Sequence, residues 1–223
     1  MPNLDLSNSK FYAEKIMVLE NAISEEDCNW IIDCHKNFDS ELTEADDHVV
    51  KKLVPWQTSS IDHPHVYGTK REAVNYGGSF ERSTEAVKSF YSYIKDMWHQ
   101  AGKHYHDQLG LEYEPTSWTD FATFHYTNGQ EMGPHVDYDG EIDLAPIATG
   151  LMYLNNDKVG GDLYFKDQDV LVKSNAGTLV IFPCIKPFYH QSTLITEGEK
   201  YHVGSGWKKS IEHINYIDGK PVI

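Results

Sequence analysis

The chain has 223 residues, 40% hydrophobic and 24% charged, a composition that fits a folded globular protein and excludes disordered, collagen-like and coiled-coil classes. Nineteen basic residues against 34 acidic ones give a formal net charge of −15, which would repel phosphate backbones, so we expect no nucleic-acid partner. Because no apolar run is long enough to span a membrane and the first residues lack a secretory pattern, we expect a cytoplasmic protein without a membrane partner.

Two helices are predicted in the N-terminal half, where residues 1–115 are helical and rich in loops. Ser24 precedes three acidic residues, as an N-cap does, and the apolar positions that follow predict a helix as far as about residue 38. From Ser83 to Leu109 the apolar residues fall three and four apart, which predicts a long amphipathic helix with Gly102 as the point of any interruption. We interpret the segment between these helices as loops and edge strands.

Short β-rich runs separated by turns begin after Pro115 and continue to about residue 210. Helices followed by antiparallel strands predict an α+β fold in which the helices cover a β-sandwich or jelly roll. No linker or internal repeat marks a boundary, so we expect one domain over residues 1–223. The three cysteines, Cys28, Cys34 and Cys184, have no spacing typical of a disulfide framework or zinc site and are expected to be inert thiols.

The motif that carries chemistry is the pair His135 and Asp137. Side chains two apart in a strand project from the same face, so an imidazole and a carboxylate could bind one metal ion together. His190, just after the apolar run GTLVIFP, is the best candidate for a third ligand. Two histidines and one carboxylate that leave other coordination positions open form the facial triad of non-heme Fe(II) oxygenases. An H-x-D pair by itself also occurs by chance.

Lys200 supports a functional interpretation of these three residues, because it begins an alternating strand shortly after His190. A cation near the metal, in a chain this acidic, suggests a pocket for an anionic cosubstrate. Without the triad, the simpler interpretation of Lys200 is a solvated surface residue.

At this point the sequence resembles the 2-oxoglutarate- and Fe(II)-dependent dioxygenases, specifically their prolyl 4-hydroxylase-like branch. The resemblance covers roughly residues 118 to 210, in the order that the family shows. The segments that carry it are FHYTNGQEMGPHVDYD, TGLMYLN, GGDLYF, GTLVIFP and HQSTLITEGEKYHVGSGW.

The resemblance implies a double-stranded β-helix, or jelly roll, of antiparallel strands flanked by N-terminal helices. It makes His135, Asp137 and His190 the iron ligands and Lys200 the partner of the distal carboxylate of 2-oxoglutarate. Tyr126 and Tyr153 match tyrosines that hydrogen-bond the cosubstrate in relatives, although core packing is the alternative for both. Thr149, on the same strand as Tyr153, could line the pocket. Fe(II), 2-oxoglutarate and O₂ are the implied cofactors, with ascorbate as a further candidate.

Three departures from the family concern the substrate. Many prolyl 4-hydroxylases have a tyrosine where this chain has Met132, and an arginine where it has Pro146. Relatives also place a tryptophan on the face of the basic residue, whereas Trp207 lies one position further along the chain. We expect a bulge at 204–206 to restore the facing of Trp207. Segments 55–80 and 139–143 are where we expect lids that grip the substrate.

Other histidines are weaker candidates for metal ligands. His104 and His106 lie two apart in a predicted helix and so point away from each other. His63 and His65 lie in a loop without a third ligand. His202 shares the face of Lys200 and either lines the pocket or is satisfied in the core, the interpretation that we prefer.

The function indicated is hydroxylation of a protein or peptide side chain, with proline as the leading candidate by resemblance. A hydroxylase of a free amino acid or other small metabolite is the first alternative, since it would use the same iron site. A non-catalytic jelly roll that binds metal is the second. The sequence leaves the oligomeric state open.

Overall fold

The computed structural model describes residues 4–42, 60–61, 66–67, 71–76, 85–113, 121–138, 146–208, 215–217 and 220–222. Its helices are the short η1 (Leu6–Asn8), α1 (Glu25–Leu42) and α3 (Glu85–Leu109). The predicted lids fall mainly outside the described residues, as do His63 and His65. Within the described portion of the chain, no helix is long and apolar enough to cross a membrane.

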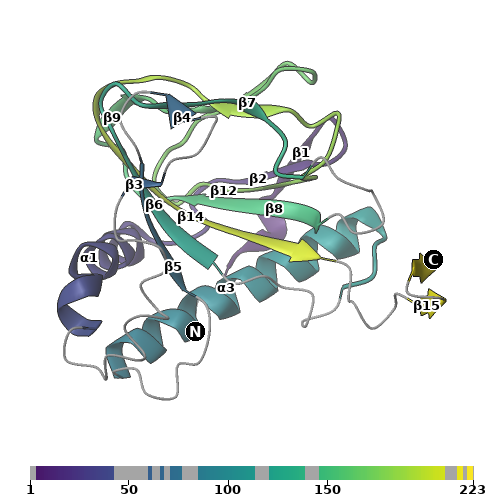
Figure 1. Cartoon of the computed structure of the whole chain (residues 1–223), viewed down its shortest axis with the longest axis horizontal. Helices are drawn as coiled ribbons and strands as arrows, with labels where there is room; N and C mark the ends of the chain where they lie inside the picture. Colours follow the sequence, from purple (N-terminus) through teal and green to yellow (C-terminus); the bar gives the residue numbers. More distant parts are fainter. Residues whose placement is uncertain are drawn as a thin grey trace.

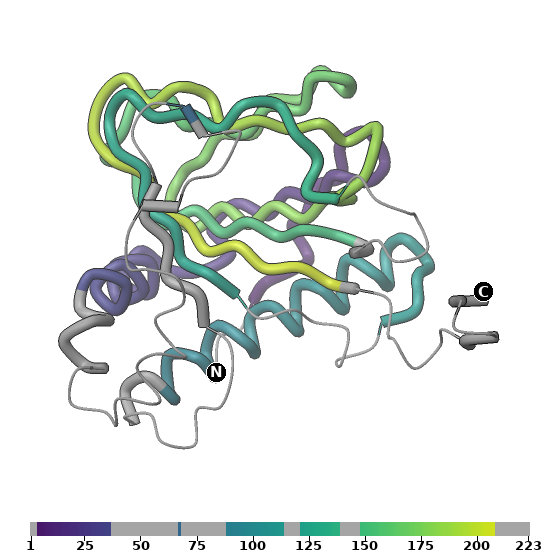
Figure 2. Tube along the Cα trace, viewed as in Figure 1, coloured from purple at the N-terminus to yellow at the C-terminus, as the bar shows by residue number. Residues whose placement is uncertain are grey.

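The strands form two antiparallel sheets that face each other across the interior of a curled half-barrel (Figures 1 and 2). The major sheet has the order β1-β2-β12-β8-β14-β6-β5-β3, and β9 pairs with β14 beside this path. Its strands are β1 (Lys10–Tyr12), β2 (Ile16–Leu19), β3 (Ser60–Ile61), β5 (Arg71–Tyr76), β6 (Phe121–Thr127), β8 (Pro146–Tyr153), β9 (Lys158–Gly160), β12 (Leu179–Phe182) and β14 (Ile195–Lys208).

The smaller sheet has the order β11-β10-β13-β7-β4. Its strands are β4 (Val66–Tyr67), β7 (Glu131–His135), β10 (Leu163–Phe165), β11 (Val170–Val172) and β13 (His190–Ser192). A separate hairpin pairs β15 (Asn215–Ile217) with β16 (Lys220–Val222). The predicted α+β jelly roll with flanking helices is confirmed, because antiparallel strands form both sheets and two long helices precede most of them.

Helix α1 begins where the sequence predicts and ends later. The Ser24 hydroxyl accepts a hydrogen bond from the Asp27 amide at 3.0 Å, which is N-cap geometry. The predicted end at about residue 38 is wrong, since the helix continues to Leu42. The extra turn contains neither glycine nor proline, so nothing in it stops helix propagation.

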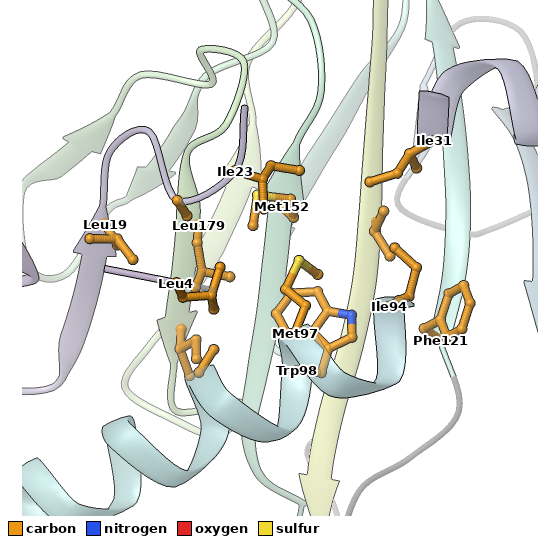
Figure 3. Packing of buried hydrophobic residues seen from close by; sticks show 14 of the residues in the cluster. Leu4, Leu19, Ile23, Ile31, Ile94, Met97, Trp98, Phe121, Met152 and Leu179 are labelled. Carbon is orange, nitrogen blue, oxygen red and sulfur yellow. The ribbon is translucent and has the colours of Figure 1, made fainter. Parts of the chain in front are cut away.

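Helix α3 runs without a break along the outer face of the major sheet (Figure 1), so the expected interruption at Gly102 does not occur. Glycine is needed there for close packing, since a Cβ atom on Gly102 would lie 2.3 Å from the Trp207 indole nitrogen. Ile94, Met97 and Trp98 of the helix pack with the sheet residues of the main core, as Figure 3 shows. The helix thus closes one side of the major sheet and leaves the other side to face the smaller sheet.

None of the three cysteines is joined in a disulfide. Cys28 and Cys184 are buried, and Cys34 is partly buried. Burial is the main cause that raises the pKa of Cys28 to about 11 and that of Cys184 to about 12. Both thiols therefore remain protonated near neutral pH, which fits the prediction that they are inert.

Candidate metal centre and its pocket

The folded chain brings His135, Asp137 and His190 together. His135 ends β7, Asp137 lies just beyond that strand, and His190 begins the neighbouring strand β13, where it pairs directly with His135. One ligand atom from each residue lies within 4.8 Å of the others, a group that could hold a metal ion. The Nε2 atoms of both histidines are 3.6 Å from Asp137 Oδ1.

Backbone carbonyls orient both imidazoles. His135 Nδ1 lies 2.8 Å from the Gly133 carbonyl oxygen, and His190 Nδ1 lies 3.2 Å from that of Phe188. A carbonyl can only accept a hydrogen bond, so each Nδ1 carries a proton and Nε2 is the atom of each ring that can bind a metal ion through its lone pair. Two lone pairs and a carboxylate oxygen then converge on one point, an arrangement that suits a cation.

Asp137 is held in its ionised form. Burial acts to raise its pKa, but interactions with His135 and His190 and a hydrogen bond from Thr149 outweigh it and keep the pKa well below the usual range. The Thr149 hydroxyl donates to Asp137 Oδ2 at 2.6 Å. Thr149 therefore orients the carboxylate across the gap between β8 and the end of β7.

A cavity of about 370 Å³ extends from these three residues into the half-barrel. Lys200 lines it and is only 2% exposed. Its ammonium group donates to the Ser192 hydroxyl and, at 3.3 Å, to the Gly161 carbonyl, and it lies 4.6 Å from the centre of the Tyr126 ring. An ammonium group buried this deeply favours an anionic ligand, as the sequence suggested.

The predicted pocket tyrosines are buried beside Lys200. Tyr126 is 1% exposed and Tyr153 is 2% exposed, and both line the cavity. Burial is the main cause that raises the pKa of Tyr153 above its ordinary value. The Tyr153 phenol therefore stays neutral at physiological pH and can act as a hydrogen-bond donor.

Two polar residues of the pocket differ from the sequence interpretation. Ser192 was not anticipated, although it lies two residues beyond His190 on the same strand, a spacing that places both on one face. His202 was assigned to the core, but it lines the cavity. The alternation that places Lys200 inward along β14 places His202 inward as well.

The expected bulge at 204–206 is wrong. β14 keeps regular register with β8 from His202 through Trp207, and the irregularity comes only between Trp207 and Lys208. Trp207 therefore faces away from Lys200 and packs edge-on against Trp98, at 5.8 Å between ring centres. Met132 lines the cavity, and Pro146 begins β8 with its side chain outside the described portion of the structure.

The two histidines of helix α3 have separate partners. His104 Nε2 lies 2.9 Å from the Ser9 hydroxyl, whereas His106 is buried with Nδ1 2.7 Å from the Gly102 carbonyl. Among the described residues, the only group of three or more possible ligands is the one at His135, Asp137 and His190.

Residues 121–208 match the family model of the 2OG-Fe(II) oxygenase superfamily. These residues form a 2OG-Fe(II) oxygenase domain. The match covers less than half of the chain and spans every residue of the centre described above. A search of curated protein sequences found no match.

Three solved structures similar to this chain are prolyl hydroxylases. The viral collagen prolyl hydroxylase of Paramecium bursaria Chlorella virus-1, in its 2OG complex, has a TM-score of 0.55 at 16% identity, covering 88% of this chain and 97% of that one. A Pseudomonas putida prolyl-4-hydroxylase has a TM-score of 0.55 at 16% identity, covering 92% of this chain and 95% of that one. A Trichoplax adhaerens prolyl hydroxylase, in complex with a hypoxia inducible factor peptide, has a TM-score of 0.56 at 15% identity, covering 88% of this chain and 84% of that one. These similarities establish a shared fold.

Fe(II) and 2-oxoglutarate suit the residues of this oxygenase. Two neutral imidazoles and a carboxylate are the donor set of mononuclear non-heme iron sites. The Lys200 ammonium, buried in the same cavity, complements a dicarboxylate. The cavity therefore has a metal-binding end and a cationic end, joined by a largely apolar wall that includes Phe124, Leu151 and Leu163.

Proposed function

We propose that this oxygenase hydroxylates a side chain of a peptide or protein, with a prolyl residue as its target. The observation that carries the proposal is one cavity with a triad of possible iron ligands at one end and a buried lysine at the other. The three solved relatives described above are prolyl hydroxylases, one of them bound to a peptide, which supports this substrate class.

In this proposal His135, Asp137 and His190 hold Fe(II), and Lys200 binds the distal carboxylate of 2-oxoglutarate. When bound, iron and 2-oxoglutarate supply an oxidation of a C–H bond by O₂ that is coupled to decarboxylation of the cosubstrate. Tyr126 and Tyr153 donate hydrogen bonds toward the cosubstrate, and Thr149 keeps Asp137 in position. These residues act by binding and orienting.

The apolar wall contributes by excluding water. Phe182 and Phe165 pack around His190, with ring centres 4.6 and 6.0 Å from the imidazole. Excluding water strengthens the charge interactions inside the pocket and limits side reactions. We therefore expect decarboxylation to depend on a correctly placed substrate.

The test is succinate formation from 2-oxoglutarate with Fe(II) and O₂, with and without proline-containing peptides. We expect peptide-dependent turnover that is lost in His190→Ala. His104→Ala serves as the matched control, because His104 lies in helix α3 away from the cavity and should leave turnover unchanged.

The assay also decides between substrate classes. Stimulation by free amino acids and by no peptide would overturn the peptide proposal in favour of a small metabolite. Bound metal without any 2-oxoglutarate turnover would overturn the catalytic proposal as a whole. Where a peptide does stimulate turnover, mass spectrometry of that peptide after the reaction locates the added oxygen on proline or on another residue.

A further inference from the structure

We propose that His202 is a further contact for the cosubstrate, and that its imidazole donates a hydrogen bond to 2-oxoglutarate bound between Lys200 and the iron. The inference rests on the proposed function of the pocket. His202 is 6% exposed and lines the same cavity as Lys200 and the metal ligands.

The register of the major sheet places His202 between the two ends of the pocket. Inward positions along β14 are Lys200, His202, Gly204 and Gly206, about 7 Å apart from one to the next. Gly206 pairs with Thr149, whose hydroxyl binds Asp137, so the metal end lies near that pair. The Lys200 ammonium reaches Ser192, two residues beyond His190 on β13, so a dicarboxylate between the ammonium and the iron lies in the cavity whose wall includes His202.

Neighbouring rings fix the orientation of the imidazole. His202 stacks on Phe124 at 4.9 Å between ring centres with an interplanar angle of 21°, and on Tyr126 at 5.7 Å and 28°. The Tyr153 ring, on the neighbouring strand β8, has its centre 5.9 Å from that of His202. This packing engages the faces of the imidazole, whereas its nitrogen atoms lie on the edge of the ring.

A phenyl ring would stack in this place equally well. What the imidazole adds is a pair of nitrogen atoms in the wall of the cavity that also holds the Lys200 ammonium. Hydrogen bonds to charged groups contribute more than neutral ones. The chemistry of His202 therefore fits cosubstrate binding better than packing alone.

The test uses His202→Phe, which keeps a stacked ring and removes both nitrogen atoms. The dissociation constant of 2-oxoglutarate is measured by calorimetry with Mn(II) in place of Fe(II), so that no turnover interferes. We expect about 10-fold or greater weakening, with partial recovery in His202→Gln. In the Fe(II) enzyme, KM for 2-oxoglutarate should rise, whereas KM for the substrate that undergoes hydroxylation should stay the same.

His104→Phe is the matched control, because it makes the same change at a histidine of helix α3 that does not line the cavity. Its affinity for 2-oxoglutarate should stay within about threefold of the wild type, well below the effect of a lost charge-assisted hydrogen bond. Wild-type affinity in His202→Phe, or equal weakening in His104→Phe, would overturn the inference. Failure of the proposed function looks different, because the wild-type protein with Mn(II) would then bind no 2-oxoglutarate.

Discussion

The two faces of strand β14 have opposite physical character. On its inward face Lys200, His202 and Gly204 border a cavity. On its outward face Val203 and Trp207 are completely buried in the hydrophobic core beneath helix α3. The outward face stabilises the fold through dense packing, and the inward face gives up that packing to hold polar groups around open space. One strand thus separates the stabilising layer from the site, so substitutions on its two faces should have separable effects.

The largest expected effect separates binding from stability on the inward face. Lys200→Met should weaken 2-oxoglutarate binding by several hundredfold, because removing one partner of a buried ion pair costs about 3–5 kcal/mol. Unfolding by urea should show little loss of stability, since the methionine side chain fills similar space. Calorimetric titration with 2-oxoglutarate measures the effect.

Lys166→Met is the control for that experiment, because Lys166 is exposed at the end of β10. It should bind 2-oxoglutarate as the wild type does. Unchanged 2-oxoglutarate affinity in Lys200→Met would show that the buried ammonium does not contact the cosubstrate. That result would contradict the proposal that Lys200 binds its distal carboxylate.

A matched pair of glycines tests the contrast at the level of single atoms. A Cβ atom on Gly150, on the outward face of β8, would lie 2.5 Å from Trp98, with Trp207 at 3.1 Å. A Cβ atom on Gly204 would lie 3.0 Å from the edge of the Phe124 ring and border the cavity. Neither glycine has a left-handed backbone, so each is required for space and not for conformation.

Gly150→Ala should therefore lower the free energy of unfolding by about 1–3 kcal/mol, as overpacking of a core does. Gly204→Ala should cost less than about 1 kcal/mol, because Phe124 can move toward open space. Urea denaturation of both variants measures the difference. Equal losses of stability would mean that the inward face is packed as rigidly as the outward one.

Period-two alternation and turn residues are local signals, so they were sufficient to predict the main strands and a β-sandwich or jelly roll. The resemblance implied the jelly roll. His135, Asp137, His190 and Lys200 could be nominated from spacing and resemblance, and they lie around one cavity. The bulge at 204–206 was predicted wrongly, because glycine content alone does not show whether a strand shifts register. Alternation along their strands could have placed Ser192 and His202 in the pocket. The contact of Ser192 with Lys200 and the stacking of His202 on aromatic rings depend on tertiary packing.

The smallest expected effect concerns a polar cluster that lies outside the cavity. Glu199 Oε2 lies 2.7 Å from His125 Nε2 and accepts a hydrogen bond from the Tyr201 hydroxyl at 3.2 Å. Burial acts to raise the pKa of Glu199, but the interaction with His125 outweighs it and leaves the pKa below the ordinary value of 4.5. The Glu199 side chain is 44% exposed, so solvent screens the pair and its contribution is on the order of 0.5 kcal/mol.

Glu199→Gln should lower the free energy of unfolding by that amount at pH 7 without changing 2-oxoglutarate binding. A carboxyl group whose pKa is lowered by folding stabilises the protein fully above its unfolded pKa and loses that contribution as the pH falls through the folded value. The stability difference between wild type and Glu199→Gln should therefore persist from pH 7 to about pH 5 and shrink below about pH 4. Urea unfolding at several pH values measures it, and a difference that grows on acidification would contradict a lowered pKa. A loss of 2-oxoglutarate affinity in this variant would show that the outer cluster is coupled to the cavity, against the separation of the two regions.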